Sequence, residues 1–130
     1  MAIKTIKKFP VKFKEIENFF ITMSDGVKLA ARMWIPLDAE KKPVPAVLEY
    51  LPYRKRDGLK SRDEEIYPYF AGHSYASLRI DLRGTGDSDG LLIDEYLPQE
   101  QADAVEVIAW LARQPWCSGT VGMMGISWGG

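Results

Sequence analysis

The sequence predicts one α/β domain in which an antiparallel hairpin precedes a parallel sheet. Two observations support this fold class. From residue 46 onward, short apolar runs fit for strands alternate with helical segments, as is typical of a parallel sheet with helices on its faces. Before them, two strand-like runs flank Asp25 and Gly26, and an Asp-Gly pair is a strong signal for a tight turn. The length of 130 residues suits a single core.

The first elements follow from short-range patterns. Strands are expected over residues 15–23 and 28–35, on either side of the turn. A polar link with several prolines, residues 36–45, leads to a short apolar run at 46–51 that fits a strand buried on both faces. Pro52 ends this strand.

The next helix and strand rest on weaker signals. Ser61 followed by Glu64 resembles a capping box, which predicts a helix start, and the helix would run to about residue 70. Pro68 lies inside this segment, and a proline in the interior of a helix disfavours the helix. A strand is expected over 75–80, and the polar, glycine-rich loop 81–90 leaves it.

Residues 98–114 have the apolar spacing of a helix, and Pro115 ends it. A short strand is expected over 121–124. The inner face of this helix is predicted to hold Ala104, Ile108 and Leu111, with Val105, Ala109 and Ala112 beside them.

Composition excludes several function classes. The apolar fraction of 46% and charged fraction of 27% are those of an ordinary globular protein. A formal net charge of −1 argues against a nucleic-acid partner held through phosphates. No apolar run has the length of a signal-peptide core or a membrane span, so no membrane partner is expected. Cys117 is the only cysteine, which suits a reducing compartment, and we expect a cytoplasmic location.

Gly125, Ser127 and Gly129 form a GxSxG motif directly after the apolar stretch 121–124. A strand that leads into this motif is how an α/β-hydrolase presents a nucleophilic serine on a sharp turn, with glycines that permit close packing. We therefore predict that Ser127 is a catalytic nucleophile. The alternatives are a glycine-rich strand exit that binds a phosphate, or a plain turn.

Gly84, Gly86 and Gly90 raise the rival hypothesis of dinucleotide binding, which needs GxGxxG after a strand. The third glycine comes one position too late, and three aspartates would surround a pyrophosphate with negative charge. We favour a structural interpretation of this loop. Its turn would be held by Asx-type bonds and an Arg-carboxylate pair among Asp81, Arg83 and Asp87.

His73 and Tyr53 are further candidates near the ends of predicted strands. His73 is the only histidine, but it precedes a strand, at the edge opposite the one where Ser127 emerges. We expect a structural role for it. Tyr53 follows the strand 46–51 on the same edge as Ser127, so its hydroxyl either donates to a developing oxyanion or belongs to an ordinary loop aromatic.

Four blocks of the chain together resemble the CocE/NonD hydrolases, which include cocaine esterase, α-amino acid ester hydrolases and X-prolyl dipeptidyl aminopeptidases. In order, the blocks are MSDGVKLAARMWIP at 23–36, LPYRK at 51–55, DLRGTGDSDG at 81–90 and PWCSGTVGMMGISWGG at 115–130. The similarity extends over nearly everything after about Glu15. Ordered blocks at matching spacing are far more specific than GxSxG alone.

The resemblance implies an α/β-hydrolase catalytic domain, a helical cap and a C-terminal β-sandwich, acting on esters or amides through an acyl-serine without a cofactor or metal. Ser127 matches the nucleophile, Tyr53 matches the tyrosine of the oxyanion hole, and Trp128 stands where the family usually has tyrosine. The residue at 128 contributes its backbone N–H, so this departure should matter little.

The resemblance covers only the N-terminal part of such an enzyme. Residues 1–130 are expected to form a truncated catalytic domain, because the triad acid, the triad histidine, the cap and the β-sandwich match nothing in them. We expect little activity from this chain alone, and an open edge on the strand 121–124 that favours self-association or binding of the missing half. The alternative is a non-catalytic binding or assembly module that keeps the half-fold.

Overall fold

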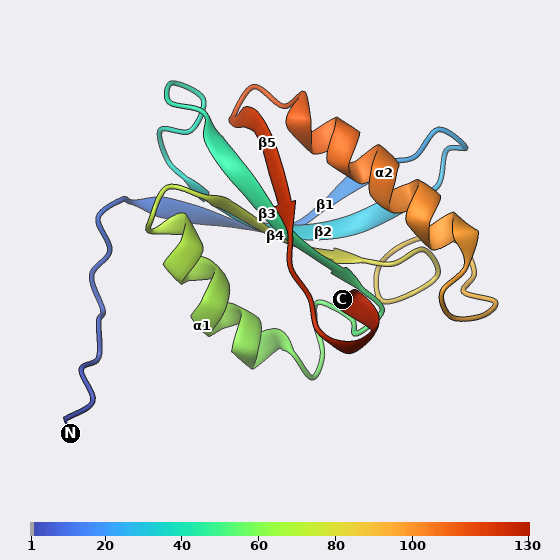
Figure 1. Ribbon diagram of the computed structural model, residues 1–130, viewed down its shortest axis with the longest axis horizontal. Helices are drawn as coiled ribbons and strands as arrows, with labels where there is room; N and C mark the ends of the chain where they lie inside the picture. The colour runs from blue at the N-terminus through green and yellow to red at the C-terminus, as the bar shows by residue number, and fades with distance from the viewer. Residues whose placement is uncertain (1) are drawn as a thin grey trace.

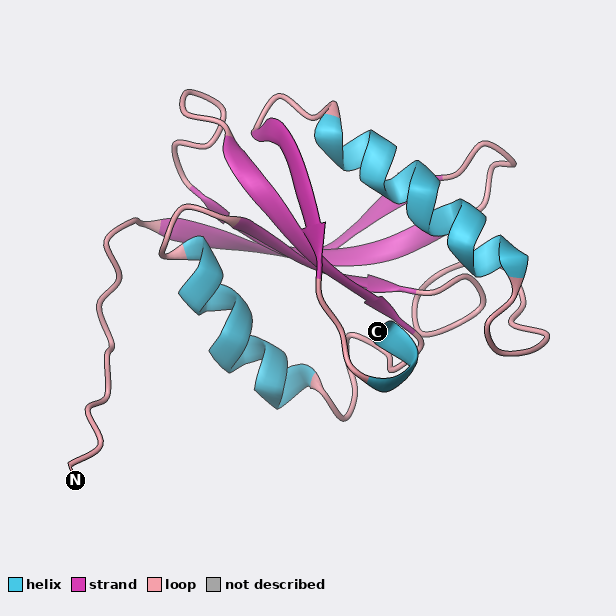
Figure 2. Cartoon of the chain, viewed as in Figure 1, coloured by secondary structure: helices cyan, strands magenta, loops and turns pink. Residues whose placement is uncertain are grey.

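The structure is a computed structural model that describes residues 2–130. It contains one five-stranded sheet with a helix on each face (Figures 1 and 2). The spatial order of the strands is β1-β2-β4-β3-β5. Their bounds are Phe13–Thr22 for β1, Lys28–Pro36 for β2, Val44–Leu51 for β3, Ala76–Asp81 for β4 and Cys117–Met123 for β5.

The predicted hairpin and parallel sheet are confirmed. Strands β1 and β2 pair antiparallel around the Asp25–Gly26 turn, where the Gly26 N–H donates to the Met23 carbonyl. Strand β3 is parallel to β4 on one side and to β5 on the other. The hairpin joins the parallel part through an antiparallel β2–β4 pair, which makes the sheet mixed.

The two helices, α1 (Lys60–Ala71) and α2 (Pro98–Ala112), cover opposite faces of the sheet (Figure 1). Glu49 and Tyr50 are consecutive residues of β3, so their side chains point to opposite faces of the sheet, and each contacts a different helix. The Tyr67 hydroxyl of α1 donates to the carboxylate of Glu49, whereas the hydroxyl of the next residue, Tyr50, donates to the Glu100 carbonyl of α2 at 3.1 Å.

The predicted capping box of α1 is wrong. The residue that caps the helix is Leu59, which makes no side-chain cap bond, so Ser61 already lies inside the first turn. The Glu64 carboxylate instead pairs with Arg32 of β2. The helix also continues through Pro68. Packing of Tyr67 and Ala71 against Trp34 stabilises this segment in spite of the proline.

The predicted inner face of α2 is wrong in part. The fully buried residues are Asp103, Val107 and Leu111, whereas Val105 is 67% exposed. Asp103 takes an inner position because Arg83, on the loop after β4, binds its carboxylate through two nitrogens, each at 2.7 Å. Because an ion-paired carboxylate can be buried, the inner face of the helix includes a charged residue and differs from the face that apolar spacing alone predicts.

Strand β5 begins earlier than predicted and forms one edge of the sheet. Its residues are mostly exposed, while those of β4 are all buried. Two apolar side chains are exposed near its carboxyl end, Met123 at 47% and, in the turn that follows, Ile126 at 70%. The predicted open edge is thus confirmed. Among residues 2–130, no helix combines the length and apolar character needed to cross a membrane.

Candidate active site

The structure brings Ser127 and Tyr53 together at the carboxyl ends of the parallel strands. Tyr53 follows the end of β3, and Ser127 follows the end of β5. Since these strands are parallel neighbours, their carboxyl ends lie at the same end of the sheet. Active sites of parallel sheets form at this end. The Tyr53 hydroxyl donates to Ser127 Oγ at 3.3 Å.

The backbone at Ser127 has the strained geometry of a nucleophile elbow. Its φ is 58°, in the left-handed region that residues other than glycine seldom adopt. The turn is so tight that a Cβ on Gly125 would lie 1.8 Å from the Gly129 carbonyl oxygen. A Cβ on Gly129 would lie 2.8 Å from Leu51 Cδ2. Close approach of the backbone therefore requires glycine at 125, whereas a larger residue at 129 would have to displace the Leu51 side chain.

Trp128 lies in a single turn of 3₁₀ helix, Ser127–Gly129. The first N–H groups of a helix have no partner within it, and the Trp128 amide N–H is one of these groups. The indole points away from the serine: its N–H donates to Glu100 Oε2 at 3.0 Å, and its ring contacts Tyr96.

Two buried charged side chains hold the loop that carries Tyr53. Arg79 Nη2 donates to the Tyr53 carbonyl at 2.7 Å. Two residues further along the loop, the Lys55 N–H donates to Asp81 Oδ1 at 2.8 Å. The Asp81 carboxylate also accepts the Asp87 N–H at 3.1 Å, which ties the loop after β3 to the loop after β4.

Arg79 belongs to a cluster of buried charges between the sheet and α1. Its Nη1 lies 3.3 Å from Glu49 Oε2 and 3.4 Å from Asp63 Oδ2. Arg62 binds the same two carboxylates from the partly exposed side. Burial raises the pKa of the Asp63 carboxyl above its ordinary value, and the nearby positive charge of Arg79 opposes this shift.

The glycine-rich loop after β4 folds around a carboxylate and not around an open anion site. Gly86 has a φ of 51°, and a Cβ there would lie 2.2 Å from Asp81 Oδ2. The carboxylate occupies the space that a phosphate would need, and burial raises the pKa of Asp81. The Asp81 carboxylate does accept the Asp87 N–H, but this bond spans six residues and is not the predicted Asx-type bond.

The predicted partners of Arg83 are wrong. Its guanidinium pairs with Asp25 of the hairpin turn and with Asp103 of α2, instead of with a carboxylate of its own loop. Asp87 pairs with Lys55 and Arg56 of the Tyr53 loop. These partners are distant in sequence, so local spacing did not reveal them.

His73 is remote from Ser127. It lies in the turn between α1 and β4, at the amino end of β4, which is the opposite edge of the sheet. Its Nδ1 is 2.7 Å from the Tyr69 carbonyl oxygen, and its ring packs on Tyr69 and Phe9. Within residues 2–130, no cluster of three or more His, Cys, Asp or Glu side chains is arranged to hold a metal ion.

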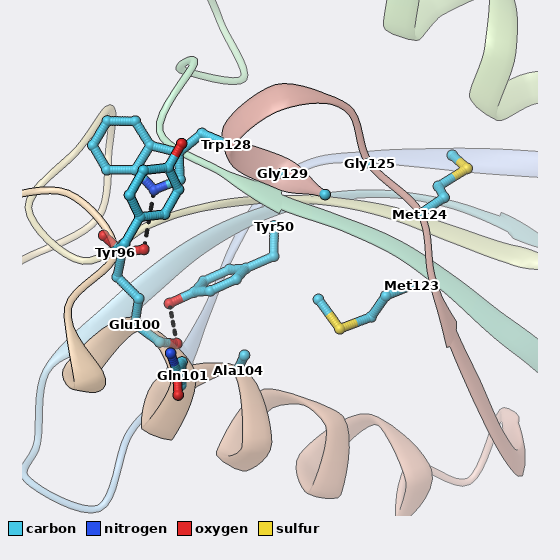
Figure 3. A pocket seen from close by; sticks show the side chains of 11 residues that line it. Tyr50, Tyr96, Glu100, Gln101, Ala104, Met123, Met124, Gly125, Trp128 and Gly129 are labelled. Atoms are coloured by element: carbon cyan, nitrogen blue, oxygen red, sulfur yellow. Dashed lines mark hydrogen bonds between the residues drawn. The ribbon is translucent and has the colours of Figure 1, made fainter.

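Two hollows lie near the candidate site, one beside the elbow and one within the Tyr53 loop. One, of about 380 Å³, lies between α2 and the elbow, with Tyr50, Glu100, Met123 and Trp128 among its walls (Figure 3). The other, of about 560 Å³, is formed within the Tyr53 loop and is lined by Pro52, Tyr53, Arg54, Asp57, Gly58 and Leu59. Tyr53 lines the second hollow, and no residue of the elbow does.

An open mixed sheet, parallel over β4, β3 and β5, with a left-handed serine in a GxSxG turn defines the N-terminal part of an α/β-hydrolase fold. A family model, X-Pro dipeptidyl-peptidase (S15 family), matches residues 25–130. The chain belongs to this family.

Individual relatives agree with the resemblance to CocE/NonD hydrolases. The chain is 37% identical over 114 residues to cocaine esterase of Rhodococcus sp., covering 85% of this chain and 19% of that protein. A CocE/NonD family hydrolase of Staphylococcus aureus has a similar structure, with a TM-score of 0.75, 23% identity, and coverage of 90% of this chain and 24% of that one. An α-amino acid ester hydrolase superposes with a TM-score of 0.66 at 23% identity, over 98% and 23% of the two chains. The chain spans about a fifth of the length of the curated relatives it matches.

Proposed function

We propose that this chain is the N-terminal, nucleophile-bearing part of a serine hydrolase that cleaves carboxylic esters or amides through an acyl-serine intermediate. The observation that carries the proposal is the left-handed Ser127 whose Oγ lies 3.3 Å from the Tyr53 hydroxyl. A strained serine between a strand and a helix is the geometry that exposes Oγ for attack.

In the proposed mechanism, Ser127 Oγ attacks the acyl carbonyl carbon and its proton passes to a general base. The carbonyl oxygen becomes an oxyanion, which accepts hydrogen bonds from the Trp128 N–H and the Tyr53 hydroxyl. Collapse of the tetrahedral intermediate releases the alcohol or amine, which takes the proton from the base. Water then hydrolyses the acyl-serine by the reverse sequence of proton transfers.

The general base and its orienting acid are proposed to come from outside residues 1–130. His73 is the only histidine in the sequence and lies at the far edge of the sheet. Without a base, a serine hydroxyl is a weak nucleophile. We propose that the missing catalytic half binds against the open edge of β5, where Met123 and Ile126 are exposed, and that self-association through this edge is the alternative.

The substrate is proposed to be a small ester or amide, including an X-Pro peptide, that enters through the hollow beside Tyr53. The family description names an X-Pro dipeptidyl-peptidase and one relative is named cocaine esterase, so both bond types deserve a test. The location remains a prediction, cytoplasmic, from the single cysteine. Cell fractionation with an antibody to the chain tests it.

The direct test of function uses the protein encoded by the complete reading frame. It is assayed with a p-nitrophenyl ester and with an X-Pro p-nitroanilide, and the Ser127→Ala variant is the control. Turnover of either substrate that is lost in Ser127→Ala supports the proposal. Turnover that survives the substitution contradicts it, and the absence of both turnover and fluorophosphonate labelling favours a non-catalytic module.

A further inference from the structure

We propose that Arg79 is a positioning residue for Tyr53. Its hydrogen bond to the Tyr53 backbone carbonyl sets the location of the Tyr53 hydroxyl. This inference rests on the proposed function, in which Tyr53 donates to the oxyanion. Arg79 itself touches neither Ser127 nor the space where a substrate carbonyl would lie, so it acts only through Tyr53.

Tyr53 needs such support because it lies on a loop. It belongs to the connection between β3 and α1, and it is 39% exposed. Its hydroxyl contact with Ser127 is on the surface and spans 3.3 Å, so that contact alone is weak. The 2.7 Å bond from Arg79 Nη2 to the Tyr53 carbonyl is shorter, is charge-assisted and comes from a wholly buried side chain.

The guanidinium of Arg79 is itself held from two directions. Glu49 stands directly opposite Arg79 in the β3–β4 register, and Asp63 approaches from α1. Both carboxylates bind Nη1, which leaves Nη2 for the Tyr53 carbonyl. A planar guanidinium makes these contacts at fixed angles, whereas a lysine ammonium is a single point that cannot reproduce them.

A second bond limits the motion that remains in the loop. The Lys55 N–H donates to Asp81, which is fully buried at the end of the same strand, β4. Strand β4 therefore holds the loop on both sides of Arg54. If the bond from Arg79 to the Tyr53 carbonyl is lost, the bond from the Lys55 N–H to Asp81 still holds the loop. The expected result is therefore a displaced hydroxyl and not an unfolded loop.

A double-substitution cycle tests this mechanism in the protein encoded by the complete reading frame. Arg79→Lys should lower kcat for ester hydrolysis by about 30- to 100-fold, since a displacement near 1 Å costs on that order, with KM changed by less than about 2-fold. In a Tyr53→Phe background the same substitution should cost less than about 3-fold, because the hydroxyl it positions is gone. Equal losses in both backgrounds would overturn the proposal.

Arg32→Lys is the matched control. Arg32 is also buried and ion-paired, but its carboxylate partners are Glu15 and Glu64, away from the Tyr53 loop. It should leave kcat within about 3-fold of the unsubstituted protein. If Arg79→Lys fails to fold, the pair Arg79→Met with Glu49→Gln removes both charges together and keeps an acceptor for Tyr67. The same loss of kcat is expected from this pair.

A readout that needs no catalysis separates failure of this inference from failure of the proposed function. In protein labelled with 3-fluorotyrosine, the ¹⁹F resonance that disappears in Tyr53→Phe reports on Tyr53. Arg79→Lys should shift or broaden this resonance, and Arg32→Lys should not. If the resonance is altered but the protein has no hydrolase activity, the positioning role of Arg79 is supported and the proposed hydrolase function is rejected. An unaltered resonance would reject the positioning role whatever the activity.

Discussion

The two sides of the candidate site are held in different ways. On the serine side, Ser127 is fixed by backbone contacts within its own motif, where Gly125 approaches Gly129. On the tyrosine side, two residues of β4 hold the loop: Arg79 binds the Tyr53 carbonyl and Asp81 binds the Lys55 N–H. The serine side is thus local in sequence, whereas the tyrosine side depends on tertiary structure.

This difference determines what each kind of substitution should do. A change within the motif acts directly on the nucleophile or its turn. A change on the tyrosine side acts on the stabilisation of charge in the transition state, because the hydroxyl is proposed to bind the oxyanion. The following substitutions, made in the protein encoded by the complete reading frame, separate these contributions.

Removal of the nucleophile should have the largest effect. Ser127→Ala should lower kcat by about 10⁶-fold, the loss found when a serine hydrolase loses its nucleophile. Ser127 is exposed, so the free energy of unfolding should change by less than about 0.5 kcal/mol. Steady-state kinetics and urea unfolding measure both quantities. Ser118→Ala, at another exposed serine, is the control, and a comparable loss there would contradict the assignment.

Removal of the tyrosine hydroxyl should have the next largest effect. Tyr53→Phe should lower kcat by about 10²- to 10³-fold, the cost of one oxyanion donor, with little change in KM. Tyr69→Phe removes a hydroxyl from an exposed tyrosine of α1 and should leave kcat unchanged. A Tyr53→Phe enzyme with normal kcat would restrict Tyr53 to an ordinary loop role.

Two glycines near the serine separate the elbow from the strand before it. Gly125→Ala should lower kcat by about 10²-fold through displacement of Ser127 and destabilise the protein by about 1–3 kcal/mol, because its Cβ would collide with the Gly129 carbonyl. Gly122→Ala, in β5, meets no atom within 4 Å and should be nearly neutral in both kinetics and urea unfolding. Equal effects at the two positions would show that the elbow is not strained.

The tyrosine side should also have a small pH dependence. The hydrogen bond from Lys55 holds the pKa of Asp87 below its ordinary value. Because the folded-state pKa is lowered, the unfolded state binds more protons as the pH falls, so this contribution is present above about pH 4 and is lost below it. Asp87→Asn should reduce the loss of unfolding free energy between pH 7 and pH 3 by less than about 1 kcal/mol, since Asp87 is partly exposed. Urea unfolding at several pH values measures this, and an unchanged loss would contradict it.

Much of the fold could be predicted from local patterns. The Asp-Gly turn, the strand buried on both faces and the GxSxG motif are signals carried by a few adjacent residues. The buried charges could not be predicted in this way, because Glu49, Arg79 and Asp103 become stable inside only when partners from distant elements reach them. One signal was present: Glu49 and Arg79 each interrupt an apolar strand, and a charge in such a strand indicates a paired interior.

The same reason explains the misassigned caps and partners. Ser61 was a plausible cap by spacing, but α1 starts at Lys60 and the Glu64 carboxylate pairs with Arg32 of β2. Arg83 had carboxylates nearby in sequence, yet its partners Asp25 and Asp103 come from the hairpin and from α2. In each case the prediction used neighbours along the chain, whereas the fold supplied neighbours in space.

The central claim is that the serine side and the tyrosine side converge on one oxyanion. A crystal structure of the protein after reaction with a phosphonate ester tests it most directly, because the phosphonyl oxygen marks the oxyanion position. We expect phosphorus on Ser127 Oγ, with that oxygen about 2.7–3.1 Å from both the Trp128 amide nitrogen and the Tyr53 hydroxyl. An adduct on a different residue, or an oxygen turned away from Tyr53, would contradict it.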